Sequence, residues 1–227
     1  MNDLISVVLN ALPAMLQGAQ FTVLFTVASL FFGFILALLV AALRLTRSKI
    51  VNALARGYVS AIRGTPLLVQ IYLIYFGLPS LGVALEPIPA GILALSLNVG
   101  AYLSESLRGA IQGVERGQWD AARSLGMSWG QTLRFIVLPQ AFRVALPSVG
   151  NSAIGLVKDT SLVSVITVTE LLRATQEAIA SSFQPLPLYI SAALVYWIIS
   201  SLLGLLQGKL ERRFNRSKVE ESSASSA

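Results

Sequence analysis

The chain has 227 residues, of which 55% are hydrophobic and only 12% are charged, and its mean hydropathy is +0.71. Soluble domains average roughly 25% charged residues, so this composition is typical of a protein whose solvent is lipid. Because cysteine and histidine are both absent, disulfides, haem ligation, the usual zinc sites and any histidine-based catalytic triad are excluded.

The first two elements follow from the apolar pattern. Residues 1–18 carry apolar side chains at helical spacing, which predicts either a short amphipathic helix that lies on the membrane surface or packs on the bundle, or an ordinary helix that leads into a span. Residues 20–43 carry no charge. At 1.5 Å per residue this stretch reaches roughly 36 Å, enough to cross a hydrocarbon core of about 30 Å.

Four further apolar stretches predict four more spans. The expected ranges are about 58–78, 88–108, 133–157 and 188–208. Gly64-Thr65-Pro66 interrupts the first of these, and since proline disfavours helix at the residue before it, we expect the span proper to begin near Pro66. Between the last two spans, residues 169–180 predict a short amphipathic helix.

The basic residues indicate an orientation. They follow the first, third and fifth spans, whereas the N-terminal stretch and residues 79–87 contain neither lysine nor arginine. The positive-inside rule therefore predicts a multi-pass membrane protein with its N-terminus outside and its C-terminus in the cytoplasm. Because the net charge of +6 sits at the ends of apolar stretches, it does not indicate nucleic-acid binding. Residues 216–227 are rich in Ser, Glu and Ala and are predicted to be a disordered cytoplasmic tail.

A polar segment separates the third and fourth spans. Residues 118–125 favour a helix whose apolar face holds Trp119, Ala122 and Leu125, and Gly126 is a helix stop. Such a helix can seat in a groove of another protein. It can equally lie on the bilayer with Trp119 and Trp129 as interfacial anchors, and the pattern alone favours neither.

Several motifs carry a family resemblance. Asp120-Ala121-Ala122, with Gly126 four residues later and then Ile136, Leu138 and Pro139, resembles the EAA motif of ABC-importer permeases, although Asp120 stands where glutamate is usual. The segments that resemble polar amino-acid permeases are residues 63–70, 96–98, 101–102, 105–108, 158–162 and 170–171. Residues 75–79 and 86–89 are most similar to L-cystine permeases.

The resemblance implies an all-α membrane protein with the type I, MetI-like fold of five transmembrane helices. Residues 19–215 would form the permease domain, with a cytoplasmic coupling helix at about 117–130. The residues that would couple to the ATPase are Asp120, Ala121, Ala122, Leu125 and Gly126. The implied partners are a cytoplasmic ATPase dimer, a second permease subunit (identical or different), an extracytoplasmic amino-acid-binding protein and membrane lipid, without nucleic acid.

The chain itself lacks the phosphate loop Gly-x-x-x-x-Gly-Lys-Ser/Thr. We therefore expect it to bind no cofactor and to catalyse no reaction, and we expect ATP-Mg on the partner. The predicted function is alternating-access import of a polar amino acid, L-cystine among the candidates. Two other classes of protein are alternatives to an ATP-driven importer. An ATP-independent secondary transporter would usually have more spans and internal repeats, and a membrane enzyme would need a convergent catalytic set.

Polar residues inside a membrane are costly and are candidates for the solute path. Asn98, Tyr102 and Glu105 share one face of the third span, at positions i, i+4 and i+7. Gln70 and Asp159 are expected to complete a site for a zwitterionic solute. A structural role is the alternative: Asn98 can bond a neighbouring helix, and Glu105 can pair with Arg108 one turn away.

Overall fold

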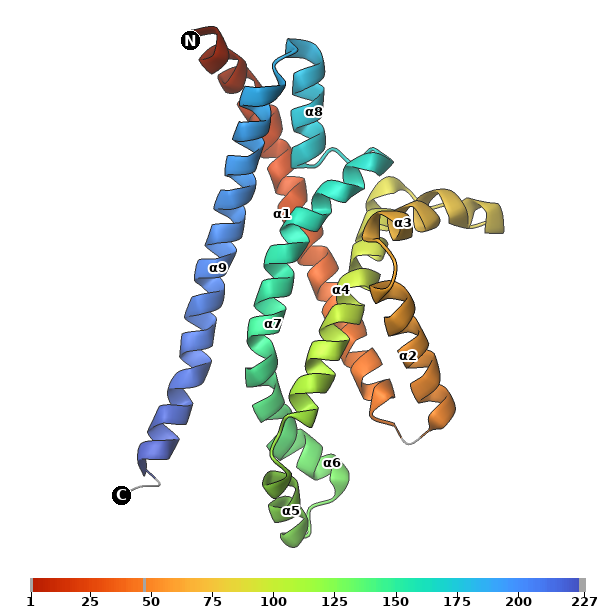
Figure 1. The fold of residues 1–227 in the computed structure, drawn as a ribbon, viewed down its shortest axis with the longest axis vertical. Coiled ribbons are helices and arrows are strands. Elements are labelled where there is room, and N and C mark those ends of the chain that lie inside the picture. The colour runs from red at the N-terminus through yellow and green to blue at the C-terminus, as the bar shows by residue number, and fades with distance from the viewer. Residues whose placement is uncertain (1, 47, 225–227) are drawn as a thin grey trace.

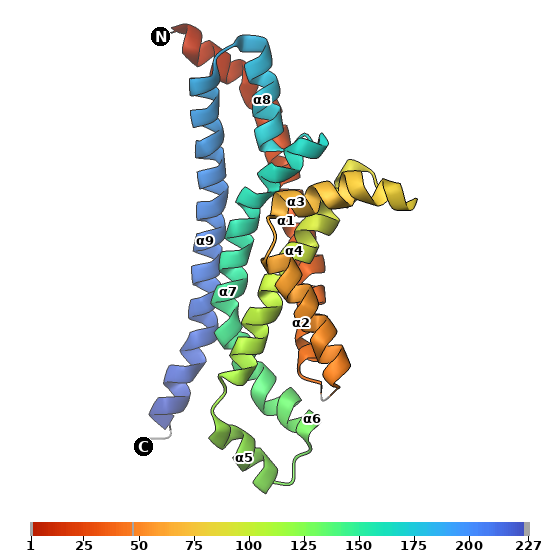
Figure 2. The same cartoon turned by 45° about the vertical axis from the view of Figure 1, so that its right-hand side comes forward.

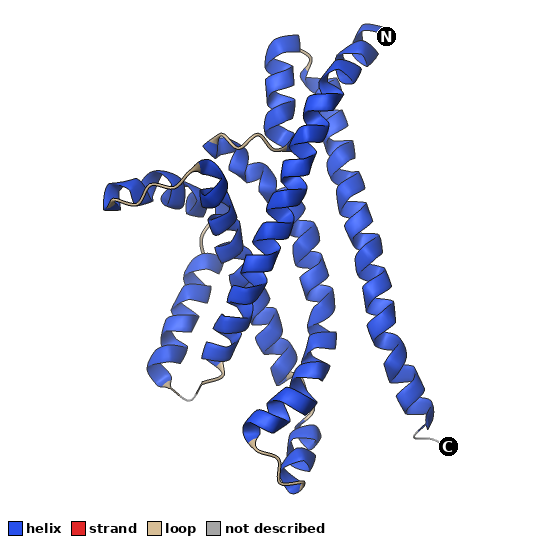
Figure 3. Cartoon of the chain, turned by 180° about the vertical axis from the view of Figure 1, so that it is seen from behind, coloured by secondary structure: helices blue, strands red, loops and turns tan. Residues whose placement is uncertain are grey.

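The protein is an elongated bundle of helices. The structure, a computed structural model, describes the backbone of residues 2–46 and 48–224 and the side chains of residues 5–46 and 48–214. Within these ranges all regular secondary structure is helical (Figure 3). The beginning of α1 and the end of α9 lie at opposite ends of the long axis (Figure 1). We call these ends the α8 end and the α5 end, after the short helices found there.

The helices are named in chain order. They are α1 (Asn2–Arg44), α2 (Lys49–Arg63), α3 (Leu67–Tyr72), the π-helix η1 (Leu73–Gly77), the 3-10 helix η2 (Leu78–Leu81), α4 (Pro87–Gln112), α5 (Arg116–Ser124), α6 (Trp129–Thr132), the π-helix η3 (Leu133–Val137), α7 (Leu138–Asp159), the 3-10 helix η4 (Thr160–Ile166), α8 (Leu171–Ser182) and α9 (Pro185–Ala224).

Between three and five segments can cross a membrane. Among the described residues, Ile5–Arg44, Pro87–Gln112 and Pro185–Phe214 are long and apolar enough. Two bent pairs qualify if each pair is a single span: Lys49–Arg63 with Leu67–Leu81, and Trp129–Ile166 with Leu171–Ser182. The fold is thus the helical membrane architecture that the composition predicts.

The core lies where α1 crosses α4. Phe25, Leu95 and Leu103 are fully buried there, together with Val163 of η4. Gly33 of α1 faces α4 so closely that a methyl group at this position would overlap Val99. Small residues at such a crossing let two helix backbones approach, which is the main route to packing energy in lipid.

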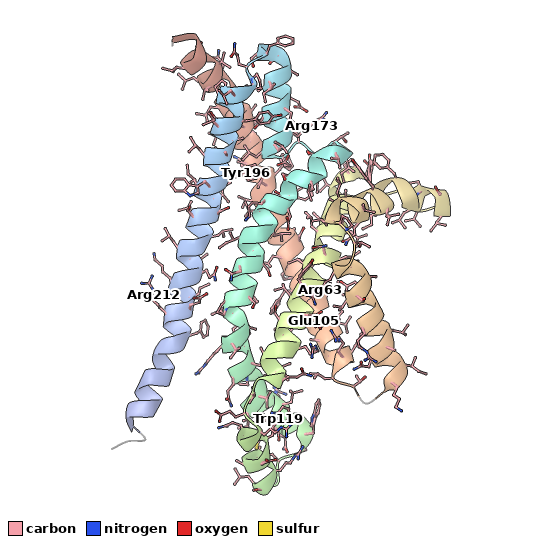
Figure 4. All side chains as sticks on the ribbon, viewed as in Figure 1. Arg63, Glu105, Trp119, Arg173, Tyr196 and Arg212 are labelled. Atoms are coloured by element: carbon pink, nitrogen blue, oxygen red, sulfur yellow. The ribbon has the colours of Figure 1, made fainter. Side chains whose placement is uncertain are left out.

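A buried carboxylate fixes the α8 end of the bundle. Glu170 is fully buried and caps α8, accepting hydrogen bonds from the backbone N–H groups of Leu172 (2.9 Å) and Arg173 (2.8 Å). The hydroxyl of Tyr196 on α9 donates to the same carboxylate at 2.6 Å, and Figure 4 shows α8 and α9 side by side at this level. The backbone N–H of Leu171 donates to Thr22 of α1. Glu170 and the neighbouring backbone of Leu171 therefore link α8 to both α9 and α1.

Of the two possibilities for residues 1–18, the structure has the helix that leads into the span, because α1 runs without a break from Asn2 to Arg44 and no separate segment precedes it within this range. The early turns are stabilised by tertiary packing: Ala11, Met15 and Ala19 are buried in a cluster with Leu171 of α8 and Leu188 of α9. At the other end of the chain, α9 continues to Ala224, through most of the predicted disordered tail, and residues 225–227 lie outside the described residues.

The predicted span of residues 58–78 is not one straight helix. Helix α2 begins earlier, at Lys49, and α2 meets the α3–η2 arm at an angle of 107°. The break falls where the sequence predicts it, because Pro66 has no N–H and disfavours helix at Thr65. The α3–η2 arm projects sideways from the bundle (Figures 1 and 2).

The predicted coupling helix of residues 117–130 is two short helices, α5 and α6, at the α5 end of the bundle (Figure 2). Gly126 adopts φ +75°, a left-handed conformation that glycine tolerates and that ends the helical path. Ser128 then starts α6 with a capping box that includes Gln131.

Candidate functional site

The polar stripe predicted on the third span faces α2 and the α2–α3 junction. Each of its three members has a contact there or close by: Asn98 with Gln70, Tyr102 with Arg63, and Glu105 with a group of arginines. Figure 4 shows Arg63 and Glu105 close together between α2 and α4. The structure therefore brings four of the five predicted solute-site residues to one side of α4.

Gln70 holds the α2–α3 break together. It is only 6% exposed, and its Nε2 donates to the carbonyl oxygens of Ile62 (2.7 Å) and Thr65 (3.1 Å). Its Oε1 accepts from Nδ2 of Asn98 at 3.0 Å. Carbonyl groups exposed by a helix break must be satisfied by protein when no water is available. These contacts give Gln70 a structural role in this conformation.

Glu105 is surrounded by positive charge. Arg44 of α1 forms an ion pair with it, Arg63 of α2 lies 3.8 Å away, and Arg108 donates to both carboxylate oxygens at 3.0 Å. The alternative that Glu105 pairs with Arg108 is thereby confirmed. Three positive charges face one negative charge among the described side chains, so this Glu105 cluster (Arg44, Arg63, Glu105 and Arg108) joins α1, α2 and α4 with an excess of positive charge.

Arg63 extends the cluster towards Tyr102. Its guanidinium lies 5.3 Å from the centre of the Tyr102 ring, a cation–π geometry. Both side chains are partly open, with Tyr102 45% exposed and the Arg63 side chain 44% exposed. This is the accessible part of the stripe, whereas Gln70 is enclosed.

Asp159 ends α7 and is half-buried. The turn η4 that follows it packs against α3 and α4, with Val163 and Ile166 in the same core cluster as Ile71. Asp159 thus precedes a turn that packs on the helices carrying Gln70 and Asn98, although none of its described hydrogen bonds or ion pairs joins it to them.

The α5 segment is seated on the bundle by part of its apolar face. Ala122 is 3% exposed, and Trp119 packs on the core cluster that includes Leu107 and Ile111. Figure 4 shows Trp119 at the junction of α5 with the bundle. Ala122 is therefore buried between α5 and the bundle and cannot contact another protein. It can only help to position the exposed residues of α5.

The side of α5 that stays open is different. Leu125 is 82% exposed and Ala121 is also exposed, while the Asp120 side chain is 73% exposed. The helical spacing of residues 118–125 predicts an apolar face. It does not show whether that face packs on the core of this chain or on a partner protein. The structure divides the predicted coupling residues between those two environments.

Two arginines of the Glu105 cluster were not predicted as site residues. Arg44 and Arg63 each stand at the end of an apolar stretch, where the positive-inside pattern alone explains them. Glu170 belongs to one of the segments that carry the family resemblance, and an acidic residue just before an amphipathic helix is also an N-cap signal that indicates its structural role.

The sequence matches the family of binding-protein-dependent transport system inner membrane components over residues 29–216. The chain belongs to this family. Its relatives include the L-cystine transport system permease protein of Bacillus subtilis (strain 168), which is 47% identical over 90% of this chain and 88% of the relative. The glutamine transport system permease protein of Escherichia coli (strain K12) is 38% identical over 92% of this chain and 96% of the relative.

Solved structures agree with this assignment. The crystal structure of an amino acid ABC transporter with histidines matches with a TM-score of 0.86 and 34% identity, over 90% of this chain and 96% of that chain. The inward-facing methionine transporter MetNI matches with a TM-score of 0.75 at 18% identity, over 89% and 97%, which shows the shared fold. The predicted type I permease fold is confirmed, and the chain is a multi-pass transport permease rather than an enzyme.

Substitution Glu105→Gln tests the Glu105 cluster. Removing the carboxylate leaves three guanidinium groups facing one another, and we expect a loss of about 2 kcal/mol of stability, within the range for hydrogen bonds to charged groups. Denaturation of the purified chain in detergent measures it. The control Glu177→Gln, which breaks the exposed Arg173–Glu177 pair (2.9 Å), should cost about 0.5 kcal/mol or less. Equal losses in the two variants would contradict a structural role for the cluster.

Proposed function

We propose that this chain is the membrane-spanning subunit of an ATP-driven importer of a polar amino acid, with L-cystine as the favoured solute. The observation that carries the proposal is family membership combined with an exposed α5 at the end of the bundle. L-cystine is favoured because the L-cystine permease shares more identity with this chain than the glutamine permease does, and because residues 75–79 and 86–89 resemble that subgroup.

The energy source is proposed to lie in a partner. The sequence contains no phosphate loop for a nucleotide. We infer that a cytoplasmic ATPase dimer binds ATP-Mg and grips α5 through Asp120, Ala121, Leu125 and the turn at Gly126, with Ala122 as internal support. This chain then needs no cofactor of its own.

Alternating access follows from how α5 is connected. Helix α4 leads into α5, and α6 and η3 lead from it into α7, so a movement of α5 is transmitted to two helices on either side of the core. The Glu105 cluster ties α4 to α1 and α2, which lets these three helices move as one unit. An import cycle therefore requires no covalent chemistry from any side chain here.

Substitution Leu125→Asp tests the coupling surface. The new charge is introduced at an 82% exposed position, so the chain should still insert and fold, but an apolar contact with the ATPase would be lost. We expect uptake in vesicles reconstituted with the ATPase and binding protein to fall at least tenfold. The control Leu81→Asp, at a 79% exposed leucine in the α3–η2 arm, should retain uptake. Wild-type uptake by Leu125→Asp, or uptake without any ATPase, would refute the proposal; the latter would favour a secondary transporter.

The solute path is proposed to follow the stripe on α4. Tyr102 is exposed and Asn98 and Asp159 are each partly exposed, so these three are proposed to meet an ammonium or carboxylate group. Gln70 and Glu105 are included in the proposed site, but their contacts indicate that they shape it: Gln70 orients Asn98, and Glu105 orients Arg63 beside Tyr102.

Substitution Asn98→Ala tests this path. It removes one amide that can bond the solute, and we expect the apparent solute affinity to fall by up to about tenfold, as for the loss of one good hydrogen bond. Uptake of L-cystine and stimulation of the ATPase are the measurements. The control is Ser191→Ala, because the Ser191 hydroxyl bonds its own helix at the Pro187 carbonyl. If Asn98→Ala leaves both quantities unchanged, Asn98 lies outside the path.

Orientation is proposed from charge. The positive-inside bias supports an extracytoplasmic N-terminus and a cytoplasmic C-terminus in a bacterial inner membrane. The α8 end would then receive the amino-acid-binding protein, and the α5 end would face the ATPase. A second permease subunit, identical or different, is proposed to complete the membrane part of the importer.

Cysteine labelling tests the orientation, because the chain contains no native cysteine. Ser124→Cys places a thiol on α5, and Ser181→Cys places one at an exposed position on α8. In intact cells we expect a membrane-impermeant maleimide to label only the α8 position, while a permeant maleimide labels both. The reverse pattern would overturn the proposed orientation and with it the coupling assignment.

A further inference from the structure

An apolar groove runs along the α5 end of the bundle, between α1, α4 and α7. It encloses about 930 Å³. Its walls include Phe34, Leu38, Ala42, Leu107, Leu138 and Phe142. Leu38 and Phe142 are 47% and 41% exposed, so the groove is open along part of its length. Its α1 and α4 walls belong to Ile5–Arg44 and Pro87–Gln112, which are long and apolar enough to span a membrane, so we infer that hydrocarbon surrounds this part of the groove.

Near the end of α4 that leads into α5, the groove adjoins a second, more polar cavity, which we call the mouth. A second cavity of about 710 Å³ shares Leu45, Ile111, Trp129 and Leu133 with the groove, so the two form one continuous space. The mouth is lined by Arg116, Asp120 and Arg123 of α5 and by Gln112 of α4. Trp129, which is 53% exposed, stands where the apolar and polar parts meet, a position typical of an interfacial anchor.

Positive charge predominates at the mouth. Arg116 and Arg123 face a single acidic side chain, Asp120, and the Arg123–Asp120 pair is 3.9 Å apart with both side chains about 70% exposed or more. Such an exposed pair leaves each group largely free to bind another partner. Arg108 of the Glu105 cluster also reaches the mouth, since it donates to Gln112 at 2.5 Å.

The geometry points to a binding site for one phospholipid with an anionic headgroup. We propose that an acyl chain lies in the groove between α1 and α7 and that the phosphate contacts Arg116 and Arg123. Apolar walls at membrane depth and an arginine-rich mouth at its boundary are complementary to the two parts of such a molecule. Arginine suits phosphate because its planar guanidinium can donate two parallel hydrogen bonds.

A lipid at this site is compatible with a protein on α5. The groove side of α5 carries Arg116, Trp119 and Arg123, at i, i+3 and i+7. Ala121 and Leu125 line neither the groove nor its mouth, so they remain available to the proposed ATPase, whereas Asp120 lines the mouth and would be shared by the two partners. The lipid would thus pack behind the coupling helix and support its position against the bundle.

The site is tested on the purified full-length chain. The chain is reconstituted into vesicles of equal phosphatidylglycerol and phosphatidylcholine, extracted, and analysed by native mass spectrometry for the lipids retained per chain. We expect preferential retention of phosphatidylglycerol. In the double variant Arg116→Gln/Arg123→Gln this preference should fall by roughly tenfold or more, because each arginine near a membrane surface attracts anionic lipid. The control Arg173→Gln, at the α8 end, should leave it unchanged.

A groove-filling variant tests the apolar part. Ala42 is exposed and lines the groove, so Ala42→Phe should fold and lose retained lipid, whereas Ala53→Phe at an exposed position on α2 should not. Equal retention of both lipids by the wild type would overturn the proposal, as would an unchanged preference in the double variant. Loss of dimer rather than lipid in Ala42→Phe would also overturn it and identify a second copy of the chain as the occupant.

Discussion

In the part of a chain that has lipid as its solvent, a polar group is costly unless protein or a water-filled cavity satisfies it. This constraint explains the three polar junctions of the structure. Gln70 satisfies carbonyl groups at the α2–α3 break, and Glu170 caps α8 while it binds Tyr196. Glu105 binds arginines from three helices. Each junction joins segments that are distant in the sequence. The buried polar side chains therefore also determine which helices lie next to one another.

The same constraint separates structural from accessible members of the predicted solute site. Gln70 and Glu105 are tied into junctions, whereas Tyr102 is exposed and Asn98, which donates to Gln70, is partly exposed. A polar stripe on a membrane helix therefore contains two kinds of residue: those that bind the scaffold and those that are left to meet a solute. The α5 segment is divided similarly, with Ala122 turned to the bundle and Leu125 turned away from it.

Much of the fold could be predicted because apolar length is a local property. The uncharged stretch at residues 20–43, the proline break at Pro66 and the stop at Gly126 are all visible in the sequence. The placement of α2 along α4 is not, because it depends on contacts such as the hydrogen bond from Tyr58 to the Leu97 carbonyl (2.6 Å). The stripe on α4 could be predicted from spacing, but its partners Arg44 and Arg63 come from other helices. Likewise, the helical spacing of Ala122 predicts that it packs against apolar groups, but not whether those groups belong to this chain or to a partner protein.

The unbroken path of α1 has a mechanical consequence. A helix of 43 residues is roughly 64 Å long, about twice the thickness of a hydrocarbon core. Its first half is clamped at Gly18 and Thr22 by the α8 junction, and its last residue, Arg44, is clamped by Glu105. One continuous helix from Gly18 to Arg44 thus connects the α8 junction to the Glu105 cluster. Tilting this part of α1 at the α8 junction would displace the charged cluster at its other end.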